Sequence, residues 1–286
     1  MNAETYRFKL GAFECIVISD GTRVYPGPGQ AFFYNAPQEE LANELRQHGI
    51  DLATWDEKVM QYLAMVIYTG DHVVLVDTGA GNLETTTGNL MANLRAEKVD
   101  PHDIDTVIIG HGHPDHIGGN TDEQGKTAFP NARYVMWKDD WDYWTTTDLS
   151  DIELDAHIKE ILLSSAKKYL PPIKDQLELI DQEQEIVPGI SAVASAGHTP
   201  GHIALALSSE GNALLYIGDA VFHPIHFSRP DWHAAFDISP QDALASRRRL
   251  LDRAATENAL VFGSHLSFPG LGRVTGLEQG WSWQPI

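Results

Sequence analysis

The stretch IIGHGHPDHIGGN, residues 108–120, begins in an apolar run and then places His111, His113, Asp115 and His116 within six positions. Buried polar side chains need hydrogen-bond partners, and one short loop offers too few of them to satisfy so many groups. Imidazole and carboxylate groups are also common ligands of divalent cations. The stretch is therefore a candidate cation site, which other parts of the chain must complete because neighbours on one loop cannot surround a metal.

Three more candidate ligands stand further along the chain, each at the end of an apolar run with strand composition: His198, Asp219 and His265. Loops held by rigid strands are where binding sites are usually built. A single loop histidine is more often hydrogen-bonded than metal-bound, but seven such residues after strands favour a metal centre. The other histidines without this pattern are expected at the surface: His48, His72, His102, His157 and His233.

Predicted strands and helices alternate along the chain in two groups. Strand composition covers 5–10, 13–18, two arms of 62–79, 105–110, 132–137, 176–180, 190–195, 203–208, 213–217 and 258–265. Helical spacing covers 84–96, most of 138–170 and 239–255. Frequent hairpin-like pairs favour two sheets covered by helices over one doubly wound parallel sheet. We expect one domain over 1–286, with a loop and helix segment at about 22–60 and a helical insertion at about 138–172 near the site.

The amino-acid composition limits the kinds of molecule that the protein is expected to bind and the compartment in which it is expected to act. The formal net charge is −20, from 40 acidic and 20 basic residues, which disfavours nucleic-acid and membrane-surface binding. The single cysteine, Cys15, excludes an internal disulfide framework and is expected to be buried in a strand. The N-terminus lacks a signal-peptide pattern and no apolar run is long enough for a membrane span, so we expect a cytoplasmic protein. The basic run at 247–249 is expected on the solvated face of a helix.

The ligand pattern resembles the binuclear metal site of the metallo-β-lactamase superfamily. The stretch VVLVDTGAG (73–81) is similar to that family's Asp-Thr-Gly strand end. Three further stretches resemble its methyl parathion hydrolase branch, which is close to the N-acyl-homoserine lactonases: FECIVISDGT (13–22), HTPGH (198–202) and SHLSFPGLGRV (264–274). The resemblance implies an α/β (α+β) fold, the αββα sandwich of two mixed sheets flanked by helices, with the site along one edge between the sheets.

The resemblance also implies how the ligands are shared between two ions. One ion would be held by His111, His113 and His198, the second by Asp115, His116 and His265, and Asp219 would bridge both. Ligands without thiolate suit Zn²⁺ first, with Mn²⁺, Fe²⁺ and Co²⁺ as alternatives. Two such ions lower the pKa of a shared water enough to supply a bridging hydroxide that attacks a carbonyl or phosphoryl centre. The expected catalytic residues are Asp115, which would orient the hydroxide and return its proton, and the bridging Asp219.

Two residues are expected to support the ligands from behind. Asp77 would hydrogen-bond a ligand histidine, although an Asx turn that closes the strand explains it equally well. His202 follows His198 by four positions on a turn and is expected to have a supporting or structural role.

The expected substrate pocket is aromatic. Phe32, Phe33 and Tyr34 are consecutive in a segment rich in glycine and proline, so some of them must point outward, into a substrate groove or the interface of a homodimer. Trp144 stands in a helical pattern and fits the site wall and the core equally well.

One position departs from the lactonase pattern. Many homoserine lactonases carry a tyrosine three residues after the bridging aspartate, where its hydroxyl assists the substrate carbonyl. Phe222 occupies that position here and cannot donate this hydrogen bond. His223 and His226 are the alternative donors that the sequence offers nearby.

These expectations favour a small-molecule hydrolase. An acidic protein with apolar pocket walls favours neutral hydrophobic esters or lactones, as in an acyl-homoserine lactonase or an arylesterase, with phosphotriesters as secondary substrates. The alternatives are a glyoxalase II-like thioesterase, an organophosphate hydrolase, and a metal-stabilised binding module without activity.

Overall fold

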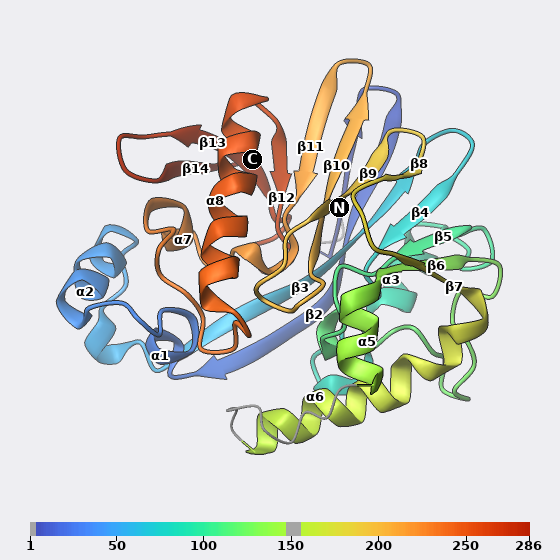
Figure 1. Cartoon of the computed structure of the whole chain (residues 1–286), viewed down its shortest axis with the longest axis horizontal. Coiled ribbons are helices and arrows are strands. Elements are labelled where there is room, and N and C mark those ends of the chain that lie inside the picture. Colours follow the sequence, from blue (N-terminus) through green and yellow to red (C-terminus); the bar gives the residue numbers. More distant parts are fainter. Residues whose placement is uncertain (1–3, 147–155) are drawn as a thin grey trace.

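Two seven-stranded sheets stack face to face, and helices cover the outer face of each (Figure 1). The computed structural model describes residues 4–146 and 156–286. The predicted αββα sandwich is confirmed. Within the described residues, no helix combines the length and apolar character that a membrane span requires.

The first sheet follows chain order from β1 to β7. Its strands pair antiparallel from β1 to β4 and parallel from β4 to β7. Parallel strands end at the same edge of a sheet, so the residues after β4 and β5 lie close together. The strands are β1 (Thr5–Leu10), β2 (Phe13–Pro26), β3 (Glu57–Tyr68), β4 (Val73–Val76), β5 (Thr106–Ile108), β6 (Arg133–Trp137) and β7 (Leu177–Ile180).

The second sheet has the order β14-β13-β12-β11-β10-β9-β8. All its neighbours are antiparallel except β11 and β12, which the crossover helix α8 (Pro240–Thr256) connects. The chain leaves β9, β11 and β12 immediately before the three downstream candidate ligands. The strands are β8 (Glu185–Val187), β9 (Ile190–Ala194), β10 (Ile203–Ser209), β11 (Asn212–Tyr216), β12 (Leu260–Phe262), β13 (Leu271–Gly276) and β14 (Trp281–Pro285).

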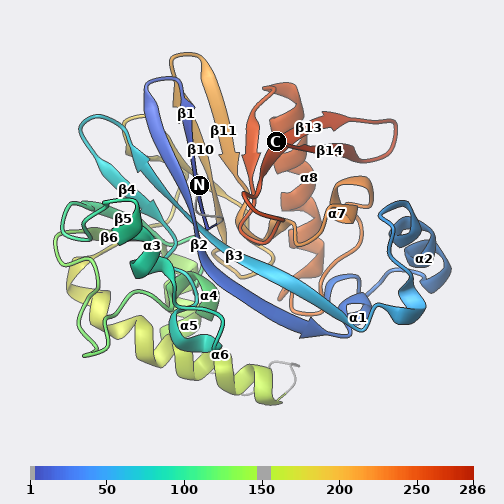
Figure 2. The same ribbon diagram turned by 180° about the vertical axis from the view of Figure 1, so that it is seen from behind.

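The helices form two outer layers and one separate group. The first sheet is covered by α3 (Leu90–Ala96), α4 (Pro114–Ile117), α5 (Lys138–Thr146) and α6 (Ala156–Tyr169). The second is covered by α8, with α7 (Ile225–Ser228) beside it. Two short helices, α1 (Pro28–Phe32) and α2 (Gln38–Gln47), lie at the far end of the long β2–β3 ribbon (Figure 2). Short 3₁₀ turns are η1 (Leu52–Thr54), η2 (Gly81–Leu83), η3 (Pro171–Gln176) and η4 (Gly218–Ala220).

The main apolar core fills the space between the sheets. Val17 and Met65 of the first sheet and Leu205 and Phe262 of the second are fully buried there. Cys15 lies in the same layer, and burial raises the pKa of its thiol to about 12. Its expected burial is therefore confirmed, and the thiol is unreactive near neutral pH.

Several predicted boundaries were wrong. The helix predicted over 84–96 begins only at Leu90, because Gly88 adopts a φ of 84° that breaks the helical run. The segment at 22–60 begins and ends as strand, since β2 and β3 continue past a register shift near Gly21. The strands β8, β13 and β14 were not predicted. Part of the helical insertion predicted over 138–172, residues 147–155, lies outside the described residues.

The basic run on α8 is only partly solvated. Arg248 and Arg249 are exposed as expected, but Arg247 is 1% exposed. Its guanidinium donates hydrogen bonds to the carbonyl oxygens of Ala220, Pro230 and Trp232. The expectation of a fully solvated face was wrong because a buried guanidinium is tolerated where carbonyl groups accept its protons.

Candidate metal centre

The seven predicted ligands lie together where one edge of the first sheet meets one edge of the second. The segment after β5 carries four of them, two on the loop and two in α4, and the segments after β9, β11 and β12 carry one each, with Asp219 in η4. The ligand atoms form two groups, and within each group all of these atoms lie within 4.8 Å of one another. Group A contains His111, His113, His198 and Asp219, and group B contains Asp115, His116, Asp219 and His265.

Asp219 belongs to both groups because its two oxygens face different histidines. Its Oδ2 lies 3.3 Å from Nε2 of His198 and 3.8 Å from Nε2 of His111. Its Oδ1 lies 3.1 Å from Nε2 of His116 and 3.1 Å from Nε2 of His265. Burial alone would raise its pKa, but the surrounding imidazoles, His265 and His116 first, hold the pKa of Asp219 well below its ordinary value.

The polar atoms at the centre fit divalent cations. Within the described residues, both ring nitrogens of His111, Nε2 of His116 and Oδ1 of Asp219 are buried without a hydrogen-bond partner. Buried polar atoms are costly when they are unsatisfied, so such a cluster needs an explanation. Burial holds the pKa of His111 and His113 well below the ordinary value, which keeps both imidazoles neutral and able to coordinate. The two groups can therefore hold two divalent ions.

Three ligand histidines are oriented by a hydrogen bond at Nδ1, which leaves Nε2 directed toward the centre. Nδ1 of His116 lies 2.8 Å from Oδ2 of Asp77. Nδ1 of His198 lies 2.9 Å from Oδ1 of Asp237. Nδ1 of His265 lies 2.9 Å from the carbonyl oxygen of Gln61. Asp237 was not predicted from the sequence, because it stands 39 positions from its histidine in a loop without a motif.

Asp77 connects the two sheets as well as contacting His116. Its Oδ1 accepts a 2.7 Å hydrogen bond from the Gly110 amide, and its Oδ2 accepts one from the Tyr216 hydroxyl. The backbone of Asp77 has a φ of 58°, a conformation that aspartate tolerates better than most residues. A local Asx turn is therefore not needed to explain this residue.

His202 and Asp140 brace the loops that carry the ligands. Nε2 of His202 accepts a 3.0 Å hydrogen bond from the amide of Asp219. The buried carboxylate of Asp140 accepts a 3.1 Å hydrogen bond from the Gly112 amide and another from the Thr199 hydroxyl. Asp140 thus ties the loop after β5 to the loop after β9. Asp140 was not predicted from the sequence, because it stands in a run of acidic and aromatic residues at the start of α5.

The predicted pocket aromatics have different positions. Phe32 and Phe33 are buried, whereas Tyr34 is 61% exposed. Trp144 is 6% exposed and packs beside His113, with ring centroids 5.3 Å apart. Trp144 therefore packs in the core and contacts a candidate ligand, and its place in the substrate pocket stays a prediction.

Phe222 and the two histidines after it differ in what they contact. The Phe222 ring stacks on His265, with centroids 5.6 Å apart. Nδ1 of His226 accepts from the Phe222 amide, and its Nε2 lies 2.9 Å from the Phe32 carbonyl oxygen. The His223 ring packs instead among Phe33, Trp55 and His48.

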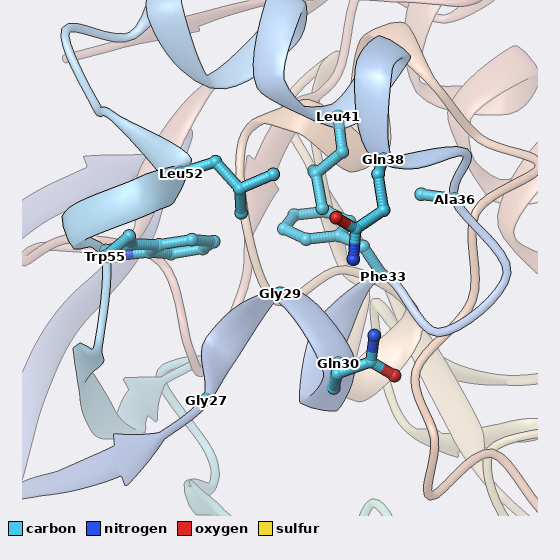
Figure 3. Close-up of a pocket in the computed structure, with 9 residues that line it drawn as sticks. All are labelled: Gly27, Gly29, Gln30, Phe33, Ala36, Gln38, Leu41, Leu52 and Trp55. Atoms are coloured by element: carbon cyan, nitrogen blue, oxygen red, sulfur yellow. The ribbon is translucent and has the colours of Figure 1, made fainter.

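A cavity of about 180 Å³ lies between α1, α2 and η1 (Figure 3). The Phe33 and Trp55 rings line it, together with Leu41 and Leu52. No residue of group A or group B lines this cavity. It is therefore distinct from the metal centre.

Comparison with known proteins agrees with this geometry. Residues 58–265 match the family model for the Metallo-beta-lactamase superfamily. The N-acyl homoserine lactonase AiiA of Bacillus thuringiensis subsp. kurstaki is 28% identical over 168 residues, which cover 58% of this chain and only 57% of AiiA.

Two solved structures are similar over nearly the whole chain. AidC, a dizinc quorum-quenching lactonase solved in complex with a product, is 28% identical with a TM-score of 0.90, covering 99% of this chain and 97% of AidC. AbOPH, a hydrolase in the beta-lactamase superfamily, is 25% identical with a TM-score of 0.88, covering 100% of this chain and 98% of AbOPH. With the family match over residues 58–265, these findings establish that the chain belongs to the metallo-β-lactamase superfamily.

Proposed function

We propose that this chain is a binuclear metal-dependent hydrolase of neutral, hydrophobic esters and lactones, with acyl-homoserine lactones as the first candidates. The observation that carries the proposal is the pair of ligand groups that share Asp219. The similarity to AidC, a dizinc lactonase, supports both the number of ions and the class of substrate.

Each ligand group would bind one of the two ions. Group A would hold one ion and group B the other, with Asp219 contacting both, and the nitrogen and oxygen ligands favour Zn²⁺. Ions held by these residues would supply Lewis-acid chemistry, polarising a substrate oxygen and lowering the pKa of a water. Asp115 has the most exposed side chain of its group, at 13%, which suits it to pass a proton to the leaving group.

The surroundings of the centre favour a neutral substrate. Phe222 and Trp144 pack directly on ligand histidines and offer apolar surface. The net charge of −20 gives an anionic phosphomonoester or glutathione conjugate little compensation for its own charge. Phosphotriesters are neutral, so we include them as secondary substrates.

Substrate competition tests this proposal. The metal-loaded protein is assayed for kcat/KM on an acyl-homoserine lactone, a phenyl ester, a dialkyl aryl phosphotriester, a phosphomonoester and S-lactoylglutathione. We expect the lactone or the ester to exceed the phosphomonoester and the thioester by at least about tenfold, or about 1.4 kcal/mol in transition-state stabilisation. A preference for the thioester would favour the glyoxalase II-like alternative. A protein with two bound ions and no hydrolysis of any substrate would be a binding module.

A further inference from the structure

The strands β2 and β3 form a long ribbon (Figure 2), which carries two tyrosines, and one of them contacts group B. In its register Gly21 pairs with Tyr62, and Tyr25 stands four residues after Gly21. Because side chains alternate between the faces of a strand, Tyr25 and Tyr62 lie on the same face of the ribbon. Their hydroxyl oxygens are 2.9 Å apart.

This tyrosine pair is next to group B. The Tyr62 ring packs edge-on against His265, with centroids 5.5 Å apart. Nε2 of His265 lies 3.4 Å from Oδ2 of Asp115. Burial, followed by the negative charge of Asp115, raises the pKa of Tyr25 to about 12, so its phenol remains protonated at neutral pH.

Hydrogen-bond counting leaves one phenol proton free. The pair has two hydroxyl protons, and the bond between them uses only one. The Arg23 guanidinium, which can only donate, lies beside the pair, with its carbon 5.1 Å from the centroid of the Tyr25 ring. Either hydroxyl can donate in this pair, and when Tyr62 donates to Tyr25 the proton of the more exposed Tyr25 remains available. Glu84 holds Arg23 in place through a 3.1 Å ion pair.

Three side chains that follow Asp219 on its loop are weaker candidates for this donor. Phe222 has no polar hydrogen. Both ring nitrogens of His226 are engaged with backbone groups. His223 packs among Phe33, Trp55 and His48, and its Nδ1 accepts from the Ile225 amide. Tyr62 is 1% exposed, whereas Tyr25 is only half-buried, so a substrate can reach the Tyr25 hydroxyl more easily.

We propose that the Tyr25 hydroxyl donates a hydrogen bond to a carbonyl oxygen of the bound ester or lactone, with Tyr62 and Arg23 as positioning residues behind it. This inference rests on the proposed function and adds a catalytic residue to it. The donor stands on the ribbon and not on the loop that follows Asp219. A phenol oriented by a chain of donors loses less freedom on binding substrate than a free side chain does.

Tyr25→Phe removes the hydroxyl and keeps the ring that packs on Phe32. In the metal-loaded protein we expect kcat/KM for an acyl-homoserine lactone to fall by about tenfold to a hundredfold, with the metal content unchanged by elemental analysis. Calorimetric affinity for the matching γ-lactam, a non-hydrolysed analogue with the same carbonyl, should fall as well. Tyr68→Phe, at the opposite end of β3, is the matched control and should change neither quantity.

The double variant tests the order of the donors. Tyr62→Phe alone should lower kcat/KM less than Tyr25→Phe, and it should add little in the Tyr25→Phe background, because Tyr62 acts through Tyr25. Fully additive losses would overturn the chain of donors. Wild-type kcat/KM and lactam affinity in Tyr25→Phe, or loss of metal from that variant, would overturn the role of Tyr25. A wild-type enzyme that hydrolyses neither lactones nor esters would instead contradict the proposed function.

Discussion

The metal centre and the aromatic segment packed beside it satisfy their buried polar groups in different ways. The aromatic segment comprises α1, α2, η1 and residues 220–236, which enclose Phe32 and Phe33. In the metal centre, both ring nitrogens of His111 lack a hydrogen-bond partner among the described residues. In the aromatic segment, His226 uses both of its nitrogens, and three carbonyl groups of the segment accept from Arg247 of α8. The centre needs ions to complete it, whereas the segment is complete as packed.

The largest expected effect comes from the one carboxylate that both ligand groups share. Asp219→Ala should lower the occupancy of both ions and reduce kcat/KM by at least about a hundredfold, since ligands and their supports typically contribute at least tenfold to hundredfold to metal affinity. Elemental analysis and steady-state kinetics on the purified variant measure the two quantities.

Two comparison variants sharpen this test. His265→Ala removes a ligand of group B only, so one ion should remain bound. His102→Ala changes an exposed histidine on a distant loop and should retain both ions. If Asp219→Ala keeps one tightly held ion, or if His265→Ala and His102→Ala behave alike, the division into two groups with a shared ligand is wrong.

A smaller effect is expected from the carboxylate that orients His198. Asp237 accepts from Nδ1–H of His198, and the amide of Asp237→Asn can present a donor to that position instead. We expect about tenfold to a hundredfold weaker affinity for the ion of group A, measured by competition with a chelator. The ion of group B should be held as in the wild type.

The matched control for Asp237→Asn lies in the aromatic segment. Glu44 is also a buried carboxylate, and its Oε1 accepts a 2.8 Å hydrogen bond from Nε of Arg229. Glu44→Gln should lower the free energy of unfolding by about 1 kcal/mol and leave both metal affinities unchanged. Equal metal loss in the two variants would mean that the two regions do not differ as described.

Residues of the metal centre could be predicted from the sequence where a pattern of neighbouring residues marks them, and not where only the folded chain brings them together. The ligands could be found from the sequence because His198, Asp219 and His265 each end an apolar run, and such runs form strands whose ends converge. Asp237 has no such signal, because only the folded loop brings it to His198. Tyr25 and Tyr62 were missed because their proximity depends on the pairing register of β2 and β3.

The aromatic segment was only partly predictable for a related reason. Consecutive aromatics at 32–34 indicate that not all can be buried, and Tyr34 is indeed exposed. Composition alone does not say which of them pack inward, since that depends on the turn made by α1. The sandwich was easier to predict, because β-branched runs with hairpin spacing indicate paired strands from the sequence alone.

The smallest expected effect comes from a half-buried charge on β3, next to the aromatic segment. Lys58 pairs with Tyr25 on the ribbon beneath the segment, and the only polar contact of its ammonium among the described residues is the Val59 carbonyl oxygen at 3.5 Å. Burial lowers the pKa of Lys58 to about 8. Burial and the charge of Lys58 also lower the pKa of His223 to about 3. This ammonium is therefore a half-buried charge that opposes folding near neutral pH.

Lys58→Met keeps the apolar stem and removes the charge. We therefore expect it to increase the free energy of unfolding at pH 7 by up to about 1 kcal/mol, a value lowered because solvent partly screens the charge. The folded protein binds fewer protons than the unfolded chain between the folded pKa of about 8 and the usual lysine value of about 10.4. Wild-type stability should therefore rise with pH across this window, and the advantage of the variant should shrink. Urea unfolding at pH 7 and pH 9.5 measures both trends, with the exposed Lys9→Met as control. Equal destabilisation of Lys58→Met at both pH values would show that the ammonium contributes favourably to the fold.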